Sequence, residues 1–431
     1  MKLRHFKTSL VVSCTFALCF SLFSCANAVT FSSKAYVNSE AEETPNNNDT
    51  IDTPQNFKYE GNLKLRERVI PQELSDNSKV MKAINQAQVK LKANKYKESL
   101  NFYIEALSLL ENNYKDSKYT LESLEKAGWI SYKLKDYSSA ICYFDRLFSY
   151  QQKYNTNYDL YHSYNTLTYI YKNQHKINAY EDVLNQSLSY CQKQYGANSS
   201  RTANVNYKLG ELKFIKNDYT SANNYLSECF SVGGSAKLLQ PKTLAMAYDY
   251  ISTANFRLRN YKKAEQYSRD ALEIKENYNF PKSQKMTTVE NIIMSCVFQK
   301  KLNDVSYSLD EAIDYRIKHK TDKTIEGARL YLFKAALLAQ SDDSIEAKDF
   351  LEYSLVRYRS YIKTFNMKYG TKVENMPVND LKEAIIAYDD MISICSALDL
   401  QREAAIYSRQ LMQFIELIPS NVDIQFNEVL T

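Results

Sequence analysis

The chain has 431 residues, of which 44% are apolar and 36 are tyrosines, but it holds only 8 glycines and 7 prolines. So few glycines and prolines exclude a β-sandwich, which needs many tight turns, and a dinucleotide-binding fold, which needs glycine-lined phosphate loops. The 55 basic and 50 acidic residues are interspersed along the chain, which excludes the clustered basic surface of a nucleic-acid-binding protein. We therefore expect an all-α protein with no nucleic-acid partner.

Residues 1–28 have the three parts of a secretory signal peptide. A basic segment (2–7) precedes an uncharged apolar run (10–23), and the small residues at 26–28 supply a cleavage site. The apolar run has about 14 residues, fewer than the ~20 needed to span a bilayer. No later segment is long and apolar enough either, so we expect no integral membrane span. The protein is therefore expected outside the cytoplasm, in the periplasm, secreted or anchored to a membrane.

An alternative processing route uses Cys25. The sequence Leu22-Phe23-Ser24-Cys25 resembles the lipobox of bacterial lipoproteins, in which the cysteine is lipid-modified and becomes the new N-terminus. Lipidation would give the protein a lipid anchor, whereas cleavage after Ala28 would release it. The sequence leaves both routes open.

Residues 29–75 are predicted to be a disordered tether. The stretch is polar around two prolines, shows little helical periodicity and has too few apolar residues to order itself. A helical array is expected from residue 76 to residue 418.

The most informative feature of the chain is an internal repeat of about 42 residues. In its clearest copies a tyrosine is followed three positions later by a small residue, and apolar residues continue at helical spacing. The successive small-residue sites are 41, 40, 42, 42, 41, 42 and 57 residues apart, which is too regular for chance. The sites are Ser99, Ala140, Tyr180, Ala222, Ala264, Val305, Ala347 and Ala404, of which Tyr180, Val305 and Ala404 match less well.

Two further sites with small residues support this register. One lies twelve residues before the first site and the other lies seven residues after it. Because a small residue lets a second helix approach closely, each unit is predicted to be two antiparallel helices that stack on the next unit. The earlier site holds Ala87, Gly128, Gly210, Ser252 and Ala335, and the later one holds Ala106, Ser187, Cys229, Ala271, Ala312 and Ser354.

This pattern resembles the tetratricopeptide repeat, whose signature has Leu-Gly in the first helix and Ala with Phe in the second. The best matches are Leu209-Gly210 with Tyr219 and Ala222, and Gly128 with Tyr137, Ala140 and Phe144. The resemblance covers about residues 79–418 and implies an all-α fold, a right-handed α-α superhelix of about eight helix pairs. The period exceeds the common 34 residues and is similar to the longer repeats of kinesin light chains and bacterial peptide-receptor regulators. HEAT repeats, which have a similar period, are the alternative, above all for the last units.

The last interval, 57 residues, exceeds the others by about fifteen. Gly370 and Pro377 interrupt a long helical run in residues 362–378, so an extended helix or an excursion is expected there. The final residues, 419–431, are expected to form a loose tail.

The cysteines and histidines form no catalytic or metal-binding motif. The five cysteines beyond the tether are far apart in sequence, and the three histidines outside the leader accompany no HExxH, GxSxG or phosphate-loop pattern. We therefore expect no enzyme, no cofactor and no metal. Carboxylate pairs such as Asp389-Asp390 and Glu122 with Glu125 are expected on solvated helix faces. Buried free thiols are expected at the core sites Cys142, Cys229, Cys296 and Cys395.

The first helix of each unit is expected to line the concave face of the superhelix and to bind a partner there. Its outward residues are aromatic rings interleaved with asparagines, which suit an extended peptide because an amide pairs with both the donor and the acceptor of a peptide bond. The alternative is that many of these tyrosines pack between helices. The predicted peptide-binding residues are Trp129, Tyr132, Asn165, Tyr169, Tyr207, Glu211, Tyr250 and Asn291.

The leading hypothesis is a non-enzymatic scaffold outside the cytoplasm that binds a peptide segment of a partner protein in this groove. The alternative is a small-ligand or glycan receptor that stacks rings on the same aromatic face. The carboxylate clamp of chaperone-binding tetratricopeptide proteins is not expected, because the helices that would carry its lysines and asparagines hold Glu125, Trp129 and Asn165 instead.

Overall fold

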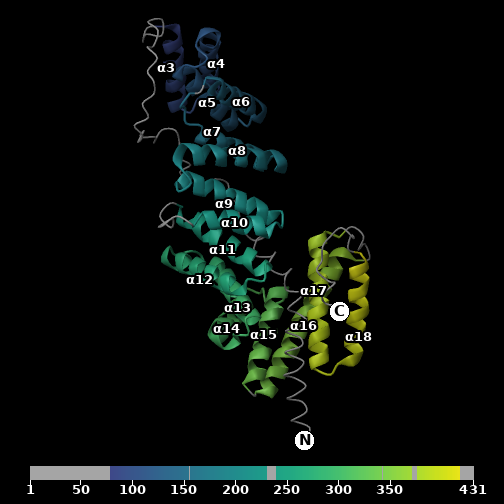
Figure 1. The fold of residues 1–431 in the computed structure, drawn as a ribbon. Helices are drawn as coiled ribbons and strands as arrows, with labels where there is room; N and C mark the ends of the chain where they lie inside the picture. The colour runs from purple at the N-terminus through teal and green to yellow at the C-terminus, as the bar shows by residue number, and fades with distance from the viewer. Residues whose placement is uncertain (1–77, 155, 231–238, 342, 371–375, 418–431) are drawn as a thin grey trace. The chain divides into compact units, whose positions relative to one another are not determined.

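A computed structural model describes residues 78–154, 156–230, 239–341, 343–370 and 376–417 (Figure 1). These residues form sixteen α-helices and one short 3₁₀ helix, and none of them is in a β-strand. The helices follow one another in consecutive packed pairs, which confirms the predicted all-α array of about eight helix pairs. The predicted signal peptide (1–28) with Cys25, the tether (29–75) and the tail (419–431) lie outside the described residues.

The described residues divide into two compact units, of which the first holds 78–212 and 228–230. Its helices are α3 (Lys79–Lys92), α4 (Tyr96–Asn113), α5 (Lys118–Lys133), α6 (Tyr137–Tyr154), α7 (Tyr161–Asn173), α8 (Ile177–Tyr195) and α9 (Ser200–Ile215), whose last residues belong to the second unit. Helix α3 packs against α4, α5 against α6 and α7 against α8. The first helices α5 and α7 also touch each other, so side chains of neighbouring first helices can share one surface.

The second unit holds residues 213–227 and 239–417. Its helices are α10 (Tyr219–Glu228), α11 (Pro241–Arg257), α12 (Tyr261–Asn277), α13 (Lys282–Phe298), η5 (Leu302–Val305), α14 (Ser306–Lys318), α15 (Ile325–Gln340), α16 (Ser344–Tyr369), α17 (Val378–Ala397) and α18 (Gln401–Glu416). Here α11 packs against α12, α15 against α16 and α17 against α18, while α13 packs against η5 and α14. The two units therefore use the same supersecondary building block.

The small residues of the repeat lie where the two helices of a pair meet. All residues at the three small-residue sites named above are buried. In the first pair, Ser99 Oγ donates to the carbonyl oxygen of Ala87 at 2.8 Å and so ties α4 to α3. In the second pair, a Cβ added at Gly128 would stand 2.8 Å from the ring of Phe144. The repeat register therefore marks the close approach of the helices, as predicted.

In seven of the helix pairs, the described turn contains a residue in the left-handed backbone conformation, five positions before the first small-residue site. Its φ lies between +54° and +62°. The next amide reaches back five residues, as in Asp136 N to Ser131 O at 2.9 Å, which closes a Schellman turn. Glycine is the usual residue there, but none of the described turns uses it. The residues are Asn94, Lys135, His175, Asn217, Arg259, Lys300 and Asp399.

Several first helices begin at a hydroxyl cap. The side-chain oxygen of the residue just before the helix accepts an amide N–H from three residues later, which satisfies one of the unpaired donors of the first turn. The caps are Ser78 on Met81, Ser117 on Thr120, Ser199 on Thr202 and Thr324 on Gly327. These caps define the residue at which each of these four first helices begins.

Helix α16 is the extended helix expected in the last interval of the repeat. It has 26 residues and ends at Gly370, where φ is +57°. Its C-terminal half packs with α17 and α18 in a common core, in which the rings of Phe365 and Phe414 have centroids 5.9 Å apart. Part of the surplus therefore lengthens the helix.

Asp390 is buried in this core, so the expectation of a solvated Asp389-Asp390 face is wrong for Asp390. Its Oδ2 atom accepts hydrogen bonds from Arg329 Nε at 3.0 Å and from the Tyr358 hydroxyl at 2.6 Å. Helix α17 is packed on more than one side, and an aspartate on an inner side must be paired. The network joins α15, α16 and α17.

The five cysteines in the described residues are free thiols, of which four are buried. The burial of Cys229, Cys296 and Cys395 agrees with their predicted core positions. The prediction is wrong for Cys142, which is exposed on α6, whereas Cys191 is buried.

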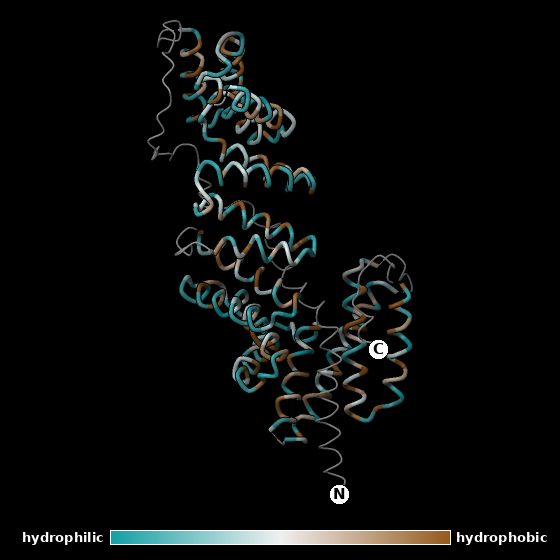
Figure 2. The backbone as a smooth tube through the Cα atoms, in the orientation of Figure 1, coloured by the Kyte–Doolittle hydropathy of each residue, from teal (hydrophilic) through white to brown (hydrophobic). Residues whose placement is uncertain are grey.

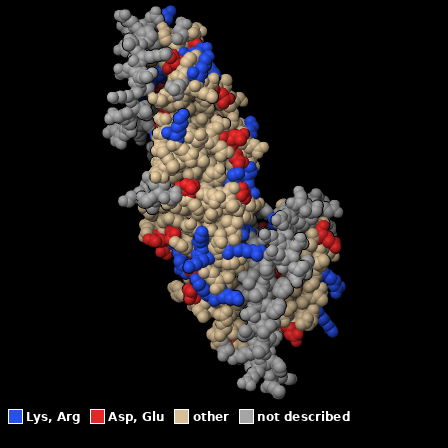
Figure 3. Space-filling model, in the orientation of Figure 1, with Lys and Arg blue, Asp and Glu red and all other residues tan. Residues whose placement is uncertain are grey.

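Polar and apolar residues alternate along most helices (Figure 2). On the face drawn in Figure 3, basic and acidic groups lie interspersed among uncharged residues, as the sequence predicts. Within the described ranges, every helix is too short or too polar to cross a membrane.

Candidate functional site

Neighbouring first helices of the first unit share a row of polar side chains. We call Tyr161, Asn165, Tyr169 and Lys172 of α7, together with Asn204, Lys208 and Glu211 of α9, the α7–α9 row. Three contacts join the two helices at successive turns. They are Asn204 Nδ2 to the Tyr161 hydroxyl at 3.0 Å, Lys208 Nζ to Asn165 Oδ1 at 2.9 Å, and Lys172 Nζ to Glu211 Oε2 at 3.2 Å.

Lys208 is the unusual member of the row, because its ammonium group is held by neutral acceptors. Besides Asn165, Lys208 Nζ lies 3.5 Å from Thr168 Oγ1 and 5.4 Å from the ring centroid of Tyr169. Among the described residues, no carboxylate forms an ion pair with Lys208. Burial, helped by the like charge of Lys172, lowers the pKa of Lys208 to about 8. The Glu211 carboxylate, which pairs with Lys172, offsets part of this effect, so two cations of the row share one carboxylate.

Helix α5 adds an aromatic corner to this face. The Trp129 ring meets Tyr96 edge-on with centroids 6.0 Å apart. Lys133 Nζ lies 5.1 Å from the Trp129 centroid and 5.9 Å from that of Tyr132. These rings are half-buried, so each presents an edge or part of a face to solvent.

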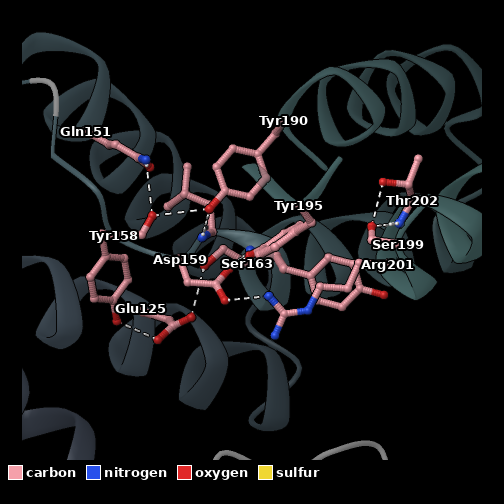
Figure 4. A network of polar contacts seen from close by, with 12 residues as sticks. Glu125, Gln151, Tyr158, Asp159, Ser163, Tyr190, Tyr195, Ser199, Arg201 and Thr202 are labelled. Atoms are coloured by element: carbon pink, nitrogen blue, oxygen red, sulfur yellow. Dashed lines mark hydrogen bonds and ion pairs between the residues drawn. The ribbon is translucent and has the colours of Figure 1, made fainter. Parts of the chain in front are cut away.

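A network around Asp159 holds the start of α7 in place (Figure 4). Asp159 accepts the amide N–H of Tyr161 at 2.9 Å, a hydrogen bond from Arg201 Nη1 at 2.8 Å, and another from the Tyr195 hydroxyl. The Arg201 guanidinium lies 4.3 Å from the Tyr195 centroid and 5.0 Å from that of Tyr161. These contacts join α7, α8 and α9 and so fix the two sides of the α7–α9 row.

The same network reaches α5 through Glu125. The Tyr158 hydroxyl donates to Glu125 Oε2 at 2.7 Å, and Ser163 Oγ lies 3.5 Å from Glu125 Oε1. Burial raises the pKa of the Glu125 carboxyl. The expectation that Glu125 belongs to a fully solvated face is wrong, because α7 and the segment before it pack over its side chain.

The predicted peptide-binding residues fall into three groups. Tyr169 is 44% exposed, and Trp129, Tyr132, Asn165 and Asn291 are half-buried. Tyr207 and Tyr250 are buried, with 8% and 6% of their surfaces exposed, and Glu211 is buried under Lys172. Tyr250 and Asn291 belong to the second unit, whereas the other six predicted residues lie on α5, α7 and α9 of the first unit.

Sequence reasoning missed the two lysines of the row. Lys208 lies 43 residues after Asn165, one repeat plus one residue, and Lys172 lies 39 residues before Glu211. A search for polar pairs separated by about one repeat would have found both. The repeat period follows from the sequence, but the offset of one first helix along its neighbour does not.

Two of the histidines, His175 and His319, have structural roles. His175 occupies the left-handed position of a turn, and the His319 ring stacks on Tyr315 with centroids 4.1 Å apart at the end of α14. In the described part of the chain, no three His, Cys, Asp or Glu side chains come together in a way that would hold a metal ion.

The paired helices, the repeat of about 42 residues and the buried small-residue register define a helical repeat protein of the tetratricopeptide-like class. No protein-family model matches the chain, and no curated protein matches it significantly. Several solved structures do resemble it. RapI in its apo form is 16% identical, with a TM-score of 0.41, and the match covers 68% of this chain and 99% of RapI.

Two further structures show a comparable likeness. The apo quorum sensor NprR from B. thuringiensis is 14% identical, with a TM-score of 0.38, over 78% of this chain and 87% of NprR. BtubC from P. vanneervenii is 12% identical, with a TM-score of 0.39, over 57% of this chain and 95% of BtubC. At these TM-scores, none of them supports a statement about the site or the activity of this chain.

Proposed function

We propose that the protein is a non-enzymatic scaffold outside the cytoplasm that binds a peptide segment of a partner protein along the α7–α9 row. The observation that carries the proposal is Lys208, a cation whose charge is opposed by burial, whose hydrogen bonds go to neutral acceptors and which shares the nearby Glu211 carboxylate with Lys172. A carboxylate on the bound segment would supply a second opposite charge for the two lysines. The favoured partner segment is therefore acidic.

The neighbouring residues suit the remainder of such a segment. Asn165 has an amide that can pair with a peptide bond once a carboxylate takes its place on Lys208. Tyr169 offers an exposed ring to an apolar side chain. Lys172, whose side chain is 42% exposed, extends the positive side of the row. The amide of Asn165, the ring of Tyr169 and the charge of Lys172 therefore follow one another at successive turns of α7.

Binding of ten-residue synthetic peptides tests the proposal. The peptides that bind the full-length protein should carry Asp or Glu, and Lys208→Gln should weaken their binding about thirtyfold or more, because truncating one partner of a buried charge pair costs ~2–5 kcal/mol. Lys208→Arg should retain part of the affinity. The matched control is Lys193→Gln, which removes an exposed lysine from α8 and should leave binding unchanged.

Two results would count against peptide binding along the α7–α9 row. One is binding that Lys208→Gln leaves intact, and the other is a preference for peptides without acidic residues. Oligosaccharides tested on the same variants address the alternative of a glycan receptor, which would depend on Tyr169 and not on Lys208.

Export is supported by the sequence of residues 1–28 alone. The mass of the mature N-terminus tests it, because cleavage after Ala28 gives a chain that begins at Val29, and lipidation gives one that begins at modified Cys25. A mature protein that still begins at Met1 would contradict both routes.

A further inference from the structure

The turns inside the helix pairs of the first unit form one edge that is rich in lysine. Consecutive helices pack together and are joined by short connections, so α3, α5 and α7 all run towards this edge and end there. Its turns, residues 90–98, 133–137 and 174–177, hold seven lysines, six of them exposed, and two carboxylates. We call these lysines the basic edge: Lys90, Lys92, Lys95, Lys97, Lys133, Lys135 and Lys176. Charges of both signs are interspersed over the chain as a whole, so the edge is a local exception.

The opposite edge of the same unit has no such excess. It consists of the connections between successive pairs, residues 114–119, 154–160 and 196–201, which hold three cations and two carboxylates. One of these cations, Arg201, is paired with Asp159 at 2.8 Å. The positive charge is therefore concentrated at the turns inside the pairs.

The two carboxylates of the basic edge compensate only part of its charge. Glu98 pairs with Lys90 at 2.5 Å and with Lys95 at 3.5 Å. Asp136 Oδ1 accepts the amide N–H of Ser139 at 3.1 Å and so caps α6. The five other lysines of the basic edge form no ion pair within the described residues. Most of the edge is therefore open to an anionic partner.

Three of the lysines occupy positions where the local backbone favours another residue. Lys95 and Lys176 are the N-caps of α4 and α8, and neither side chain forms a capping hydrogen bond. Serine, threonine, aspartate and asparagine are preferred there, and a cation opposes the helix dipole. Lys135 has a left-handed φ of +62°, which favours glycine. Positive charge is thus retained at a cost to local stability, as is expected where residues serve a function.

The second unit repeats this pattern in its own turns. Arg259 and Lys300 have left-handed φ values of +61° each, and Lys301 is the N-cap of η5 without a capping hydrogen bond. Basic residues therefore replace the locally preferred ones in several turns of the repeat, not in one alone.

We propose that the basic edge of the first unit binds the anionic headgroups of a lipid membrane surface. Lysine suits mobile headgroups, because its ammonium group on a flexible stem needs no fixed geometry, unlike the planar fork of arginine. Ile177, which is 48% exposed, and the half-buried rings of Trp129 and Tyr132 lie beside these lysines. Lysines next to apolar and aromatic side chains are typical of a membrane interface. The proposal does not depend on the α7–α9 row.

Trp129 is a native reporter of this contact, because it is the single tryptophan of the chain. Its ring centroid lies 5.1 Å from Lys133 Nζ and 6.0 Å from the centroid of Tyr96, at the turns that carry the basic edge. The probes are vesicles of phosphatidylglycerol and phosphatidylcholine in equal parts, and vesicles of phosphatidylcholine alone. Both contain acyl chains brominated close to the headgroup, which quench tryptophan fluorescence at short range. The full-length protein is used, and its apolar leader segment (10–23) is the same in every variant.

The vesicles with phosphatidylglycerol should quench Trp129, and those of phosphatidylcholine alone should not. One lysine near an anionic surface contributes about fivefold in affinity. Lys135→Gly and Lys176→Ser should therefore each weaken vesicle binding about fivefold, and together about 25-fold. About 0.5 M NaCl should abolish the binding by screening. Both variants should nevertheless be more stable than the parent, because glycine suits the left-handed turn and serine can cap α8.

The matched control is Lys118→Gln, which removes an exposed lysine from the opposite edge and should leave the quenching unchanged. Equal quenching by the two kinds of vesicle, or its absence with the anionic ones, would overturn the proposal. Equal binding of the double variant and Lys118→Gln would do the same. So would polyglutamate that shifts the Trp129 emission as strongly as the anionic vesicles do, because the edge would then bind a soluble acidic polymer.

Discussion

Lys208 donates to neutral acceptors, and burial and the Lys172 ammonium oppose its charge more than the Glu211 carboxylate supports it. Such a buried charge lowers the stability of the free protein, and it is retained where a bound partner supplies an opposite charge. Lys208 differs in this respect from Lys275, which is fully buried but paired with Asp249 Oδ2 at 2.6 Å and with Thr288 Oγ1 at 2.6 Å. Lys275 is a structural charge, and Lys208 is the candidate binding charge.

The lowered pKa of Lys208 predicts opposite pH dependences for folding and binding. The pKa is about 8 in the folded chain against 10.5 for a free lysine, so unfolding takes up a proton between these pH values. Through this group, stability rises as the pH rises from about 8 towards 10.5. Binding of an acidic peptide needs the charged form, so affinity should fall about tenfold per pH unit above about pH 8. Titrations from pH 6.5 to 9.5 measure both.

The variant Lys208→Met isolates this effect. It should lose both pH dependences and melt no lower than the parent at neutral pH, because it removes a disfavoured charge and keeps the aliphatic stem. A large drop in its melting temperature would show that Lys208 holds the fold together, and the binding role would then lose its support.

Gly128 is required by the ring of Phe144, not by its own backbone. In the variant Gly128→Ala, the new Cβ would stand 2.8 Å from a fully buried ring. Overpacking of this kind costs about 1–3 kcal/mol, more than alanine gains over glycine in a helix. Chemical denaturation should therefore show a less stable first unit. Adding Phe144→Leu should recover part of the loss, and additive losses would contradict the direct contact.

At the scale of the helix pair, the turns store strain that a glycine would release. Lys135 has a φ of +62° and is one of the recurring left-handed residues. For a non-glycine residue, that conformation costs about 1–2 kcal/mol. Glycine avoids this cost, but its greater freedom in the unfolded chain offsets about 0.5–1 kcal/mol of the gain. Lys135→Gly should therefore stabilise the first unit by roughly 0.5–1 kcal/mol. Chemical denaturation measures the change.

The same substitution to glycine inside a helix should have the opposite effect on stability. Glu105→Gly on the exposed face of α4 should cost about 1 kcal/mol. If Lys135→Gly destabilised the protein as much as Glu105→Gly does, the turn would not carry the strain that its φ indicates.

The helix pairs could be predicted from the sequence because their packing constrains residue size. Residues such as Ala140 and Ala264 are fully buried at the point where two helices touch, and a larger side chain there would push the helices apart. The long last interval likewise predicted the extension of α16. The left-handed turns left no such signal, because asparagine, lysine, arginine and histidine all occupy them in place of glycine.

The candidate site was predictable only in part. The aromatic and amide residues Trp129, Asn165 and Tyr169 reach the surfaces of α5 and α7, because the repeat period predicts the helix and its approximate phase. The burial of Tyr207 and the contact between Lys208 and Asn165 depend on how far one first helix is offset along the next. A repeat length defines the neighbours but not this offset, which tertiary packing sets.

At the scale of the whole molecule, the free thiols bear on how the helices stay folded. The described residues hold five free cysteines and no cluster of side chains that could bind a metal ion, so their stability must come from the packing between consecutive helices. Such a protein can remain folded in an oxidising compartment only if its thiols are protected. Four of the five described thiols meet this condition by burial.

This protection predicts the thiol chemistry of the folded protein. Burial raises the pKa of Cys191, Cys296 and Cys395 to about 11 and that of Cys229 to about 12, so hardly any reactive thiolate forms at pH 8. Under native conditions, an alkylating reagent should modify Cys142 alone among these five cysteines, and all five after denaturation. A reducing agent should not change the melting temperature. Rapid native modification of a second one of these thiols, or a lower melting temperature under reduction, would show that helix packing does not protect them.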